Sequence, residues 1–235
     1  MGVYGGLKPD DWTHWGQFTT FKSNAAELLR KSLRANQRIY CSPLVDPYQP
    51  AEQARQLMPA ILDAVIETPP LVFTIQTRGP LIVGDLGRLI TLSKRTRLRV
   101  SFSLTTNREQ VRKWYEPHCA TLAERLSAIE QLRAAGIVTF ATLAPLLPCD
   151  PEEFAEIALA ATSEDIIADP LHIRAVKKHG ATTRQAAINI SAKREFLAWL
   201  DPAFQADVLT RIQAVVAKAG RRCAAGTEGF GWLAK

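Results

Sequence analysis

The chain has 235 residues, which is enough for one large domain or two small ones, and its 47% hydrophobic and 22% charged residues are ordinary for a globular protein. No apolar run reaches the roughly 18 residues of a membrane span, and residues 1–11 lack the basic start and apolar core of a secretory signal, so we expect a cytoplasmic protein. The net charge of +6 permits a nucleic-acid partner without requiring one.

Helices and strands alternate along the chain after an aromatic N-terminal segment. Hydrophobic periodicity, caps and helix-breaking residues predict these elements. Strands are predicted over 38–45, 71–77, 98–104, 137–144 and 165–168. Helices are predicted over 23–34, 50–67, 85–94, from a cap at Asn107 to near 115, over 121–135, from Asp150-Pro151 to 162, and over 193–199 and 201–220.

This alternation predicts an α/β fold of parallel βαβ units with five strands. Five parallel strands fit either a doubly wound sheet or part of a barrel, and the pattern alone favours neither. No glycine-rich phosphate loop follows any strand, so a nucleotide-binding sheet has no positive support.

The four cysteines are far apart in the sequence. Cys41, Cys119, Cys149 and Cys223 have no C-x-x-C spacing, which argues against a zinc finger or a redox dithiol and favours separate reduced thiols. His118 and Cys119 are neighbours, but two adjacent ligands cannot close a metal site alone. We therefore predict no metal ligands.

The segment around residues 40–52 is the most informative in the chain. A strand-type run ends at Asp46-Pro47, and Pro50 is suited to the first turn of a helix. Ligands of α/β proteins bind where strands end, so Asp46, Tyr48 and Gln49 are candidate site residues.

Six short segments, in the same order, resemble the radical S-adenosylmethionine proteins related to spore photoproduct lyase. They are D-P-Y-Q-P-x-E at 46–52, T-R-G-P-L-I-V-G-D-L at 77–86, V-S-F-S-L-T-T at 100–106, E-P at 116–117 with R-L at 125–126, A-G-I at 135–137 and A-P-L-L-P at 144–148. The resemblance spans roughly residues 15–180.

The resemblance implies a partial (β/α)6-type TIM-like barrel with parallel strands. In that family the first strand leads into a C-x-x-x-C-x-x-C loop whose thiolates hold a 4Fe–4S cluster, and the cluster reduces S-adenosylmethionine to a 5′-deoxyadenosyl radical. This chain has no such motif. The expectation is therefore one domain over 1–235 with the first strand and cluster loop missing: an aromatic segment over 1–22, barrel repeats over 23–180 and a C-terminal helical extension over 181–235.

The function implied is that of a radical S-adenosylmethionine enzyme, truncated and inactive as given, whose cofactors would be S-adenosylmethionine and a 4Fe–4S cluster. A full-length active enzyme would also need an electron donor. The alternative is a non-enzymatic basic barrel protein that binds nucleic acid or a protein partner.

The family also implies site residues. Asp46 would contact the methionine amino group, Arg78 would replace a family lysine, Ser103 would face the ribose and carboxylate, and Pro145 would lie near the adenine. We also expect Tyr48 to contact substrate. Three further residues follow the last predicted strand and would either bind an anionic substrate or stabilise their own loop: Asp169, His172 and Arg174. No catalytic residue is assigned.

Overall fold

The computed structural model describes residues 20–41, 45–172 and 185–235. Six parallel strands form one sheet whose spatial order, β1-β2-β3-β4-β5-β6, follows the chain. The strands are β1 Arg38–Cys41, β2 Val72–Thr77, β3 Arg97–Ser103, β4 Thr139–Leu146, β5 Ile166–Pro170 and β6 Cys223–Ala224. Each strand therefore pairs with the next along the chain, which is the connectivity of a barrel.

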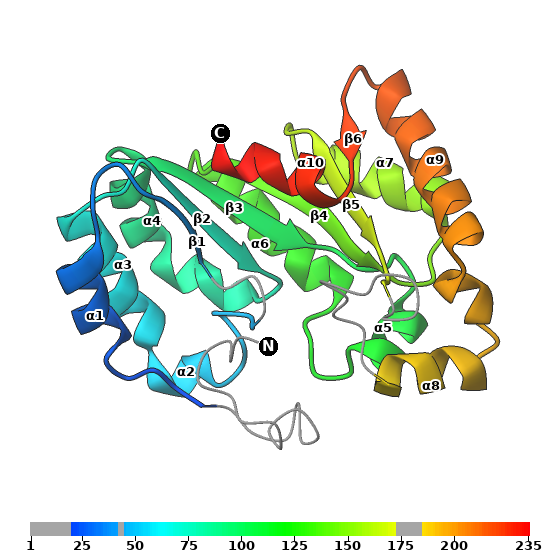
Figure 1. Ribbon diagram of the computed structural model, residues 1–235, viewed down its shortest axis with the longest axis horizontal. Helices are drawn as coiled ribbons and strands as arrows, with labels where there is room; N and C mark the ends of the chain where they lie inside the picture. The colour runs from blue at the N-terminus through cyan, green and yellow to red at the C-terminus, as the bar shows by residue number, and fades with distance from the viewer. Residues whose placement is uncertain (1–19, 42–44, 173–184) are drawn as a thin grey trace.

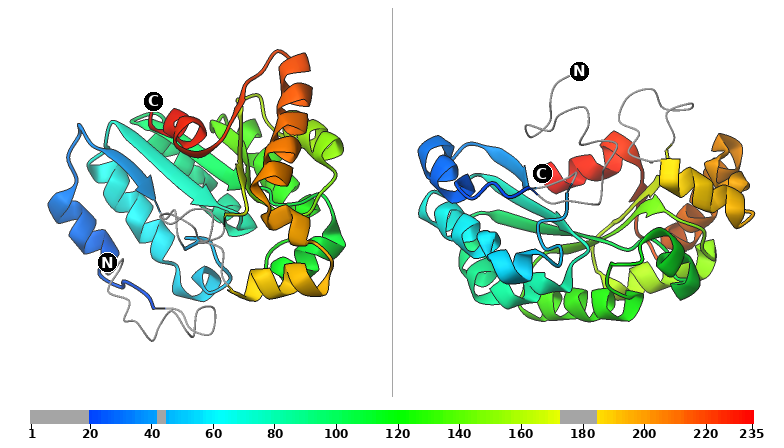
Figure 2. Two further views of the ribbon diagram at one scale, coloured as in Figure 1. Left: turned by 45° about the vertical axis from the view of Figure 1, so that its right-hand side comes forward. Right: turned by 90° about the horizontal axis from the view of Figure 1, so that it is seen from below.

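The sheet curves into an open arc with most helices outside it (Figures 1 and 2). The helices are α1 Ala25–Ser32, α2 Glu52–Arg55, α3 Leu57–Glu67, α4 Leu86–Ser93, α5 Glu109–Tyr115, α6 Leu122–Ala134, α7 Pro151–Ala161, α8 Gln185–Lys193, α9 Pro202–Lys218 and α10 Gly226–Gly231. Of the helices in the described residues, α10 alone lies in the hollow of the arc in Figure 2. The predicted partial barrel of parallel strands is confirmed.

The main core lies between the outer face of the sheet and the helices. On β3, Val100 and Phe102 are fully buried in this core, while Ser101 and Ser103 take the alternate positions. Successive residues of a strand point to opposite faces, so the two serines face the hollow. Burying an apolar side chain such as that of Val100 or Phe102 stabilises the fold by roughly 1.5–3 kcal/mol.

A second, smaller core fills part of the hollow. Trp232 and Leu233, just after α10, pack with Phe140 of β4 and Ile167 of β5. The hydroxyl of Thr74 donates to the main-chain oxygen of Leu233 at 2.8 Å and fixes this segment to β2. The C-terminal residues thus cover the inner face of the sheet toward the beginnings of its strands.

Five strands were expected and six are present. The additional strand, β6, pairs with β5 through Cys223 and Ala224 alone. A two-residue strand carries no detectable alternation, so periodicity could not reveal it.

The prediction of a single helix over 50–67 is wrong. The structure has two helices there, α2 and α3, separated by Gln56, whose φ is 49°. The cause is Pro59, which has no N–H to donate and whose ring would clash with the carbonyl of Arg55, four residues earlier. Helix α2 ends at Arg55 accordingly. The Glu52 carboxylate accepts the N–H of Met58 at 2.6 Å and satisfies one free donor of α3.

Other expected boundaries also shift. The helix expected over 193–199 is wrong, because α8 ends at Lys193 and a 3-10 helix follows over Leu197–Leu200. Asn107 is not a cap, since Arg108 occupies that position and the Asn107 amide donates to Glu153 at 2.8 Å. The expected strand over 38–45 is observed to Cys41, and residues 42–44 lie outside the described residues.

Candidate functional site at the strand ends

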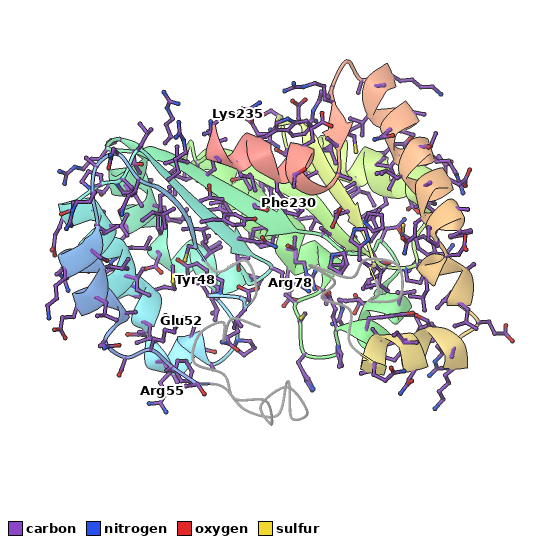
Figure 3. The ribbon with its side chains drawn as sticks, in the orientation of Figure 1. Tyr48, Glu52, Arg55, Arg78, Phe230 and Lys235 are labelled. Atoms are coloured by element: carbon purple, nitrogen blue, oxygen red, sulfur yellow. The ribbon has the colours of Figure 1, made fainter. Side chains whose placement is uncertain are left out.

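The carboxyl ends of the parallel strands meet along one edge of the sheet, and several charged side chains gather there. Asp46 follows β1 and Arg78 directly follows β2; Figure 3 shows Arg78 beside the strand ends. Thr105 follows β3, and Glu116 follows α5. We call the seven residues linked at this edge the strand-end cluster: Asp46, Thr77, Arg78, Ser103, Thr105, Glu116 and Arg125.

Among the described residues, three hydrogen bonds hold Asp46. Its Oδ1 accepts the Thr77 hydroxyl at 2.6 Å and the Tyr48 N–H at 2.9 Å, and its Oδ2 accepts the Arg78 N–H at 2.8 Å. A carboxylate has about four acceptor positions, so the acid keeps capacity for a further donor. The structure thus places the predicted residues Asp46 and Arg78 in direct contact.

Glu116 joins two arginines. Its Oε1 pairs with the Arg78 guanidinium, and its Oε2 accepts Arg125 Nη2 at 2.7 Å and the Thr105 hydroxyl at 2.9 Å. Burial alone would raise the pKa of Glu116, but Arg78 and Arg125 hold it below its ordinary value. Glu116 is therefore ionised over the neutral pH range.

The position of Glu116 follows from the sequence around it. Glu116 ends α5 because Pro117 cannot continue the helix. Arg112, one turn earlier on α5, then donates to the main-chain oxygens of Glu116 at 2.9 Å and Cys119 at 2.7 Å. These bonds fix the turn that carries the carboxylate.

The inner face of the sheet is polar below the cluster. Ser101 and Thr142 share a hydrogen bond of 2.7 Å, and the Tyr40 hydroxyl donates to Gln76. Ser103 is only 1% exposed, yet its hydroxyl has no partner among the described residues. A buried hydroxyl without a partner is unfavourable unless a ligand or water supplies one.

Tyr48 faces the protein interior. It is 2% exposed, and its hydroxyl donates to Asp85 at 3.1 Å. Burial and the Asp85 charge raise the pKa of Tyr48. A side chain on Gly79 would meet the Tyr48 main-chain oxygen at 2.1 Å, so only glycine permits this close approach. The geometry commits Tyr48 to holding the 46–52 segment against β2.

The other predicted positions are spread along the same edge. Pro145 is half-buried near the end of β4. Asp169, in β5, accepts the Gly226 N–H at 3.1 Å, and its second oxygen lies 3.3 Å from His172 Nε2. The His172 contact fits a loop stabilised by its own polar groups, whereas the Gly226 contact joins β5 to the start of α10. Arg174 lies outside the described residues.

The cysteines do not fit a 4Fe–4S cluster. All four are free, and no three potential metal ligands of the His, Cys, Asp and Glu types converge within residues 20–41, 45–172 and 185–235. Burial raises the pKa of Cys41, Cys149 and Cys223 to about 12 each. A 4Fe–4S cluster needs several thiolates at one place, and the described cysteines do not provide them.

Several basic residues that contribute to the positive net charge are engaged within the protein. Arg95 donates to the Ile66 oxygen at 2.6 Å and Arg97 to the Lys235 oxygen at 2.7 Å. Arg221 donates to the Thr162 oxygen at 2.7 Å. A surface hollow of about 500 Å³ beside the turn from α6 into β4 lies at the opposite edge from the strand-end cluster.

Four members of the strand-end cluster were not predicted as site residues from the sequence: Thr77, Thr105, Glu116 and Arg125. Each belongs to a segment that resembles the family, but no role followed from that. The available signal was the E-P and R-L pair, which places an acid nine positions before an arginine. The partners of Glu116 that follow β2 and β3, Arg78 and Thr105, are brought to it by tertiary contacts, which the spacing of residues in the sequence does not reveal.

Comparison with known proteins gives distant relatives. No family model matches the chain. An uncharacterized protein of Mycobacterium tuberculosis (strain ATCC 25618 / H37Rv) is 32% identical over 132 residues, which is 54% of this chain and 38% of the relative. An uncharacterized protein of Methanocaldococcus jannaschii is 25% identical over 134 residues, which is 57% of this chain and 49% of the relative. The chain thus spans less than half the length of these curated relatives.

Solved structures of spore photoproduct lyase have a similar fold. A single-residue mutant has a TM-score of 0.58 at 11% identity, covering 86% of this chain and 64% of that chain. A double mutant with bound AdoMet and dinucleoside spore photoproduct has a TM-score of 0.56 at 12% identity, with the same coverage. The likeness shows a shared barrel fold.

No helix in the described ranges has the length and apolar character needed to cross a bilayer, and the cytoplasmic location stays a prediction.

Proposed function

We propose that the strand-end cluster binds the methionine end of S-adenosylmethionine. The chain would then form the barrel of a radical S-adenosylmethionine enzyme of the spore photoproduct lyase-like group. The observation that carries the proposal is an acid beside a base at the strand ends: Asp46 contacts the main chain of Arg78, whose side chain is 29% exposed. An α-amino acid presents the complementary pair of ammonium and carboxylate.

Each role follows from what these side chains offer. Asp46 would accept N–H bonds from the ammonium with its remaining acceptor capacity. Arg78 would donate to the carboxylate, since a guanidinium matches a carboxylate in geometry and charge. Ser103 would turn its unpartnered hydroxyl toward the ribose or the carboxylate.

Radical chemistry is not assigned to these residues alone. S-adenosylmethionine supplies a 5′-deoxyadenosyl radical only when a 4Fe–4S cluster reduces it, and the described thiols do not fit that cluster. One lyase structure contains a dinucleoside spore photoproduct. By analogy we propose a nucleic-acid substrate for a complete enzyme, with Asp169, His172 and Arg174 as further contacts.

The test is calorimetric titration of S-adenosylmethionine into the purified chain. Charge-assisted bonds contribute roughly 1.5–3 kcal/mol each against several kcal/mol of association cost, so we expect a high-micromolar or weaker Kd. Asp46→Asn should weaken binding at least about tenfold. Asp207→Asn is the matched control, because that exposed aspartate on α9 lies outside the site.

A second arm tests the enzyme. A version extended upstream with a C-x-x-x-C-x-x-C segment, reconstituted anaerobically and reduced with dithionite, should release 5′-deoxyadenosine. Absence of binding by the chain, together with absence of product from the extended version, would refute the proposed function.

A further inference from the structure

We propose that Glu116 is a positioning residue that sets the Arg78 guanidinium to receive the ligand carboxylate, and that this pair makes the site select a carboxylate-bearing sulfonium nucleoside over the same nucleoside without the carboxylate. The inference rests on the proposed function, because it concerns the same site. It adds a residue and a selectivity to that site.

The contacts of Glu116 leave its carboxylate one orientation. Arg78 takes Oε1, while Arg125 and Thr105 take Oε2 at 2.7 and 2.9 Å. The side chain is 8% exposed. A carboxylate tied on both oxygens cannot turn away, so it fixes the guanidinium that it contacts.

Two positive charges, on Arg78 and Arg125, are balanced within the cluster by the negative charges of Glu116 and Asp46. Arg125 is 2% exposed and also donates to the Ala120 oxygen at 3.0 Å, whereas Arg78 is 29% exposed. Arg78 is therefore the arginine of this pair that a ligand can reach.

Among the described residues, the Asp46 carboxylate makes no ion pair with the Arg78 guanidinium. That carboxylate accepts the main-chain N–H of Arg78 and the Thr77 hydroxyl. An arginine side chain is long and has many rotamers, and holding it in place before binding lowers the entropy lost when the ligand arrives. Glu116 supplies that restraint through Oε1.

A purely structural role for Glu116 predicts something different. If Glu116 only held α5 to α6 through Arg125, its loss would lower stability and weaken all ligands alike. The selectivity between two ligands that differ by a carboxylate separates these cases.

The experiment measures Kd for S-adenosylmethionine and for decarboxylated S-adenosylmethionine. The wild-type chain should prefer the carboxylate form by at least about tenfold, as expected for one charge-assisted contact. Glu116→Gln should reduce the preference to about threefold or less. Glu109→Gln is the matched control: it is the same change on α5, at a half-exposed carboxylate that pairs with Arg112 at 2.6 Å, and it should keep the wild-type preference.

The Arg78→Ala variant completes a double-mutant cycle. Arg78→Ala should lose the preference, and adding Glu116→Gln to it should change nothing further, because the two residues act as a unit. Should Glu116→Gln fail to fold by circular dichroism, Glu116→Asp keeps the charge on a shorter side chain and should give an intermediate preference.

The outcomes distinguish the two proposals. If Glu116→Gln or Glu116→Asp keeps the wild-type preference for the carboxylate form, the positioning role is refuted while the proposed function stands. If Glu116→Gln weakens the affinity for both ligands equally, the positioning role is also refuted and the structural role is supported. A wild-type chain that binds neither ligand refutes the proposed function and this inference with it.

Discussion

Two serines on β3 differ in their partners. Ser101 shares a hydrogen bond with Thr142, whereas the hydroxyl of Ser103 has none among the described residues, and both are essentially inaccessible to solvent. Leaving a buried polar group without a partner costs roughly 1–3 kcal/mol. Ser103 thus lowers the stability of the free protein at a position where a ligand could use its hydroxyl.

We predict opposite effects of removing the two hydroxyls. Ser103→Ala should raise the free energy of unfolding by about 1 kcal/mol and weaken S-adenosylmethionine binding. Ser101→Ala should lower the free energy of unfolding by about 1 kcal/mol, because Thr142 loses its partner. Urea unfolding measures both, and a destabilised Ser103→Ala variant would contradict the prediction.

Single residues of the site were partly predictable from the sequence. The strand-to-turn break identified Asp46, and the family resemblance implied Ser103, which the structure places on the inner face of β3, opposite the main core. Glu116 could not be found this way. Its partner Arg78 lies 38 positions earlier, and only the closed arrangement of β2, α5 and α6 brings them together.

Helices and strands were predictable from the sequence where a hydrophobic pattern extends over many residues. The prediction failed where a single residue determines the boundary of an element. The strands β2 to β5 lie where alternation and apolar runs placed them. The prediction of one helix over 50–67 failed because the apolar spacing continues across Gln56, whereas Pro59 cannot make the helical hydrogen bond back to Arg55. Gln56 absorbs the break in a left-handed conformation, which is unfavourable for a residue with a side chain.

Replacing Gln56 by glycine should therefore stabilise the protein. Glycine adopts a φ of 49° without steric cost, so Gln56→Gly should raise the free energy of unfolding by about 0.5–1 kcal/mol. Gln53→Gly, inside α2, is the control and should lower it by about 1 kcal/mol. Thermal or urea unfolding measures the pair. Equal destabilisation by both changes would show that the Gln56 side chain makes a contact outweighing the strain.

At the scale of the whole molecule, the segment after β6 completes the inner face of the sheet. It was predicted only as part of a helical extension, because α10 contains three glycines and has weak helical propensity. Gly229 is required there, since an added Cβ would meet the Ala224 oxygen at 2.5 Å. Long-range packing rather than local sequence determines this region.

Removing the aromatic side chain of this segment should be costly. Trp232 is 7% exposed within the small core of β4 and β5, so Trp232→Ala should lower the free energy of unfolding by about 3 kcal/mol. Leu197→Ala is the control at a 55% exposed leucine and should stay within about 0.5 kcal/mol of wild type. Urea denaturation measures both, and similar small changes would show that the segment contributes little to stability.

The hydrogen bond between Thr74 and Leu233 joins positions 159 residues apart. Contacts of such large sequence separation form late, because a long loop must close before they are rewarded. During synthesis the strands from β1 to β5 emerge first, and their inner surface stays in contact with water until residues 226–235 arrive. A chain that lacks residues 226–235 presents Phe140 and Ile167 to other molecules, so we expect its tendency to associate to be greatest before this segment has been made.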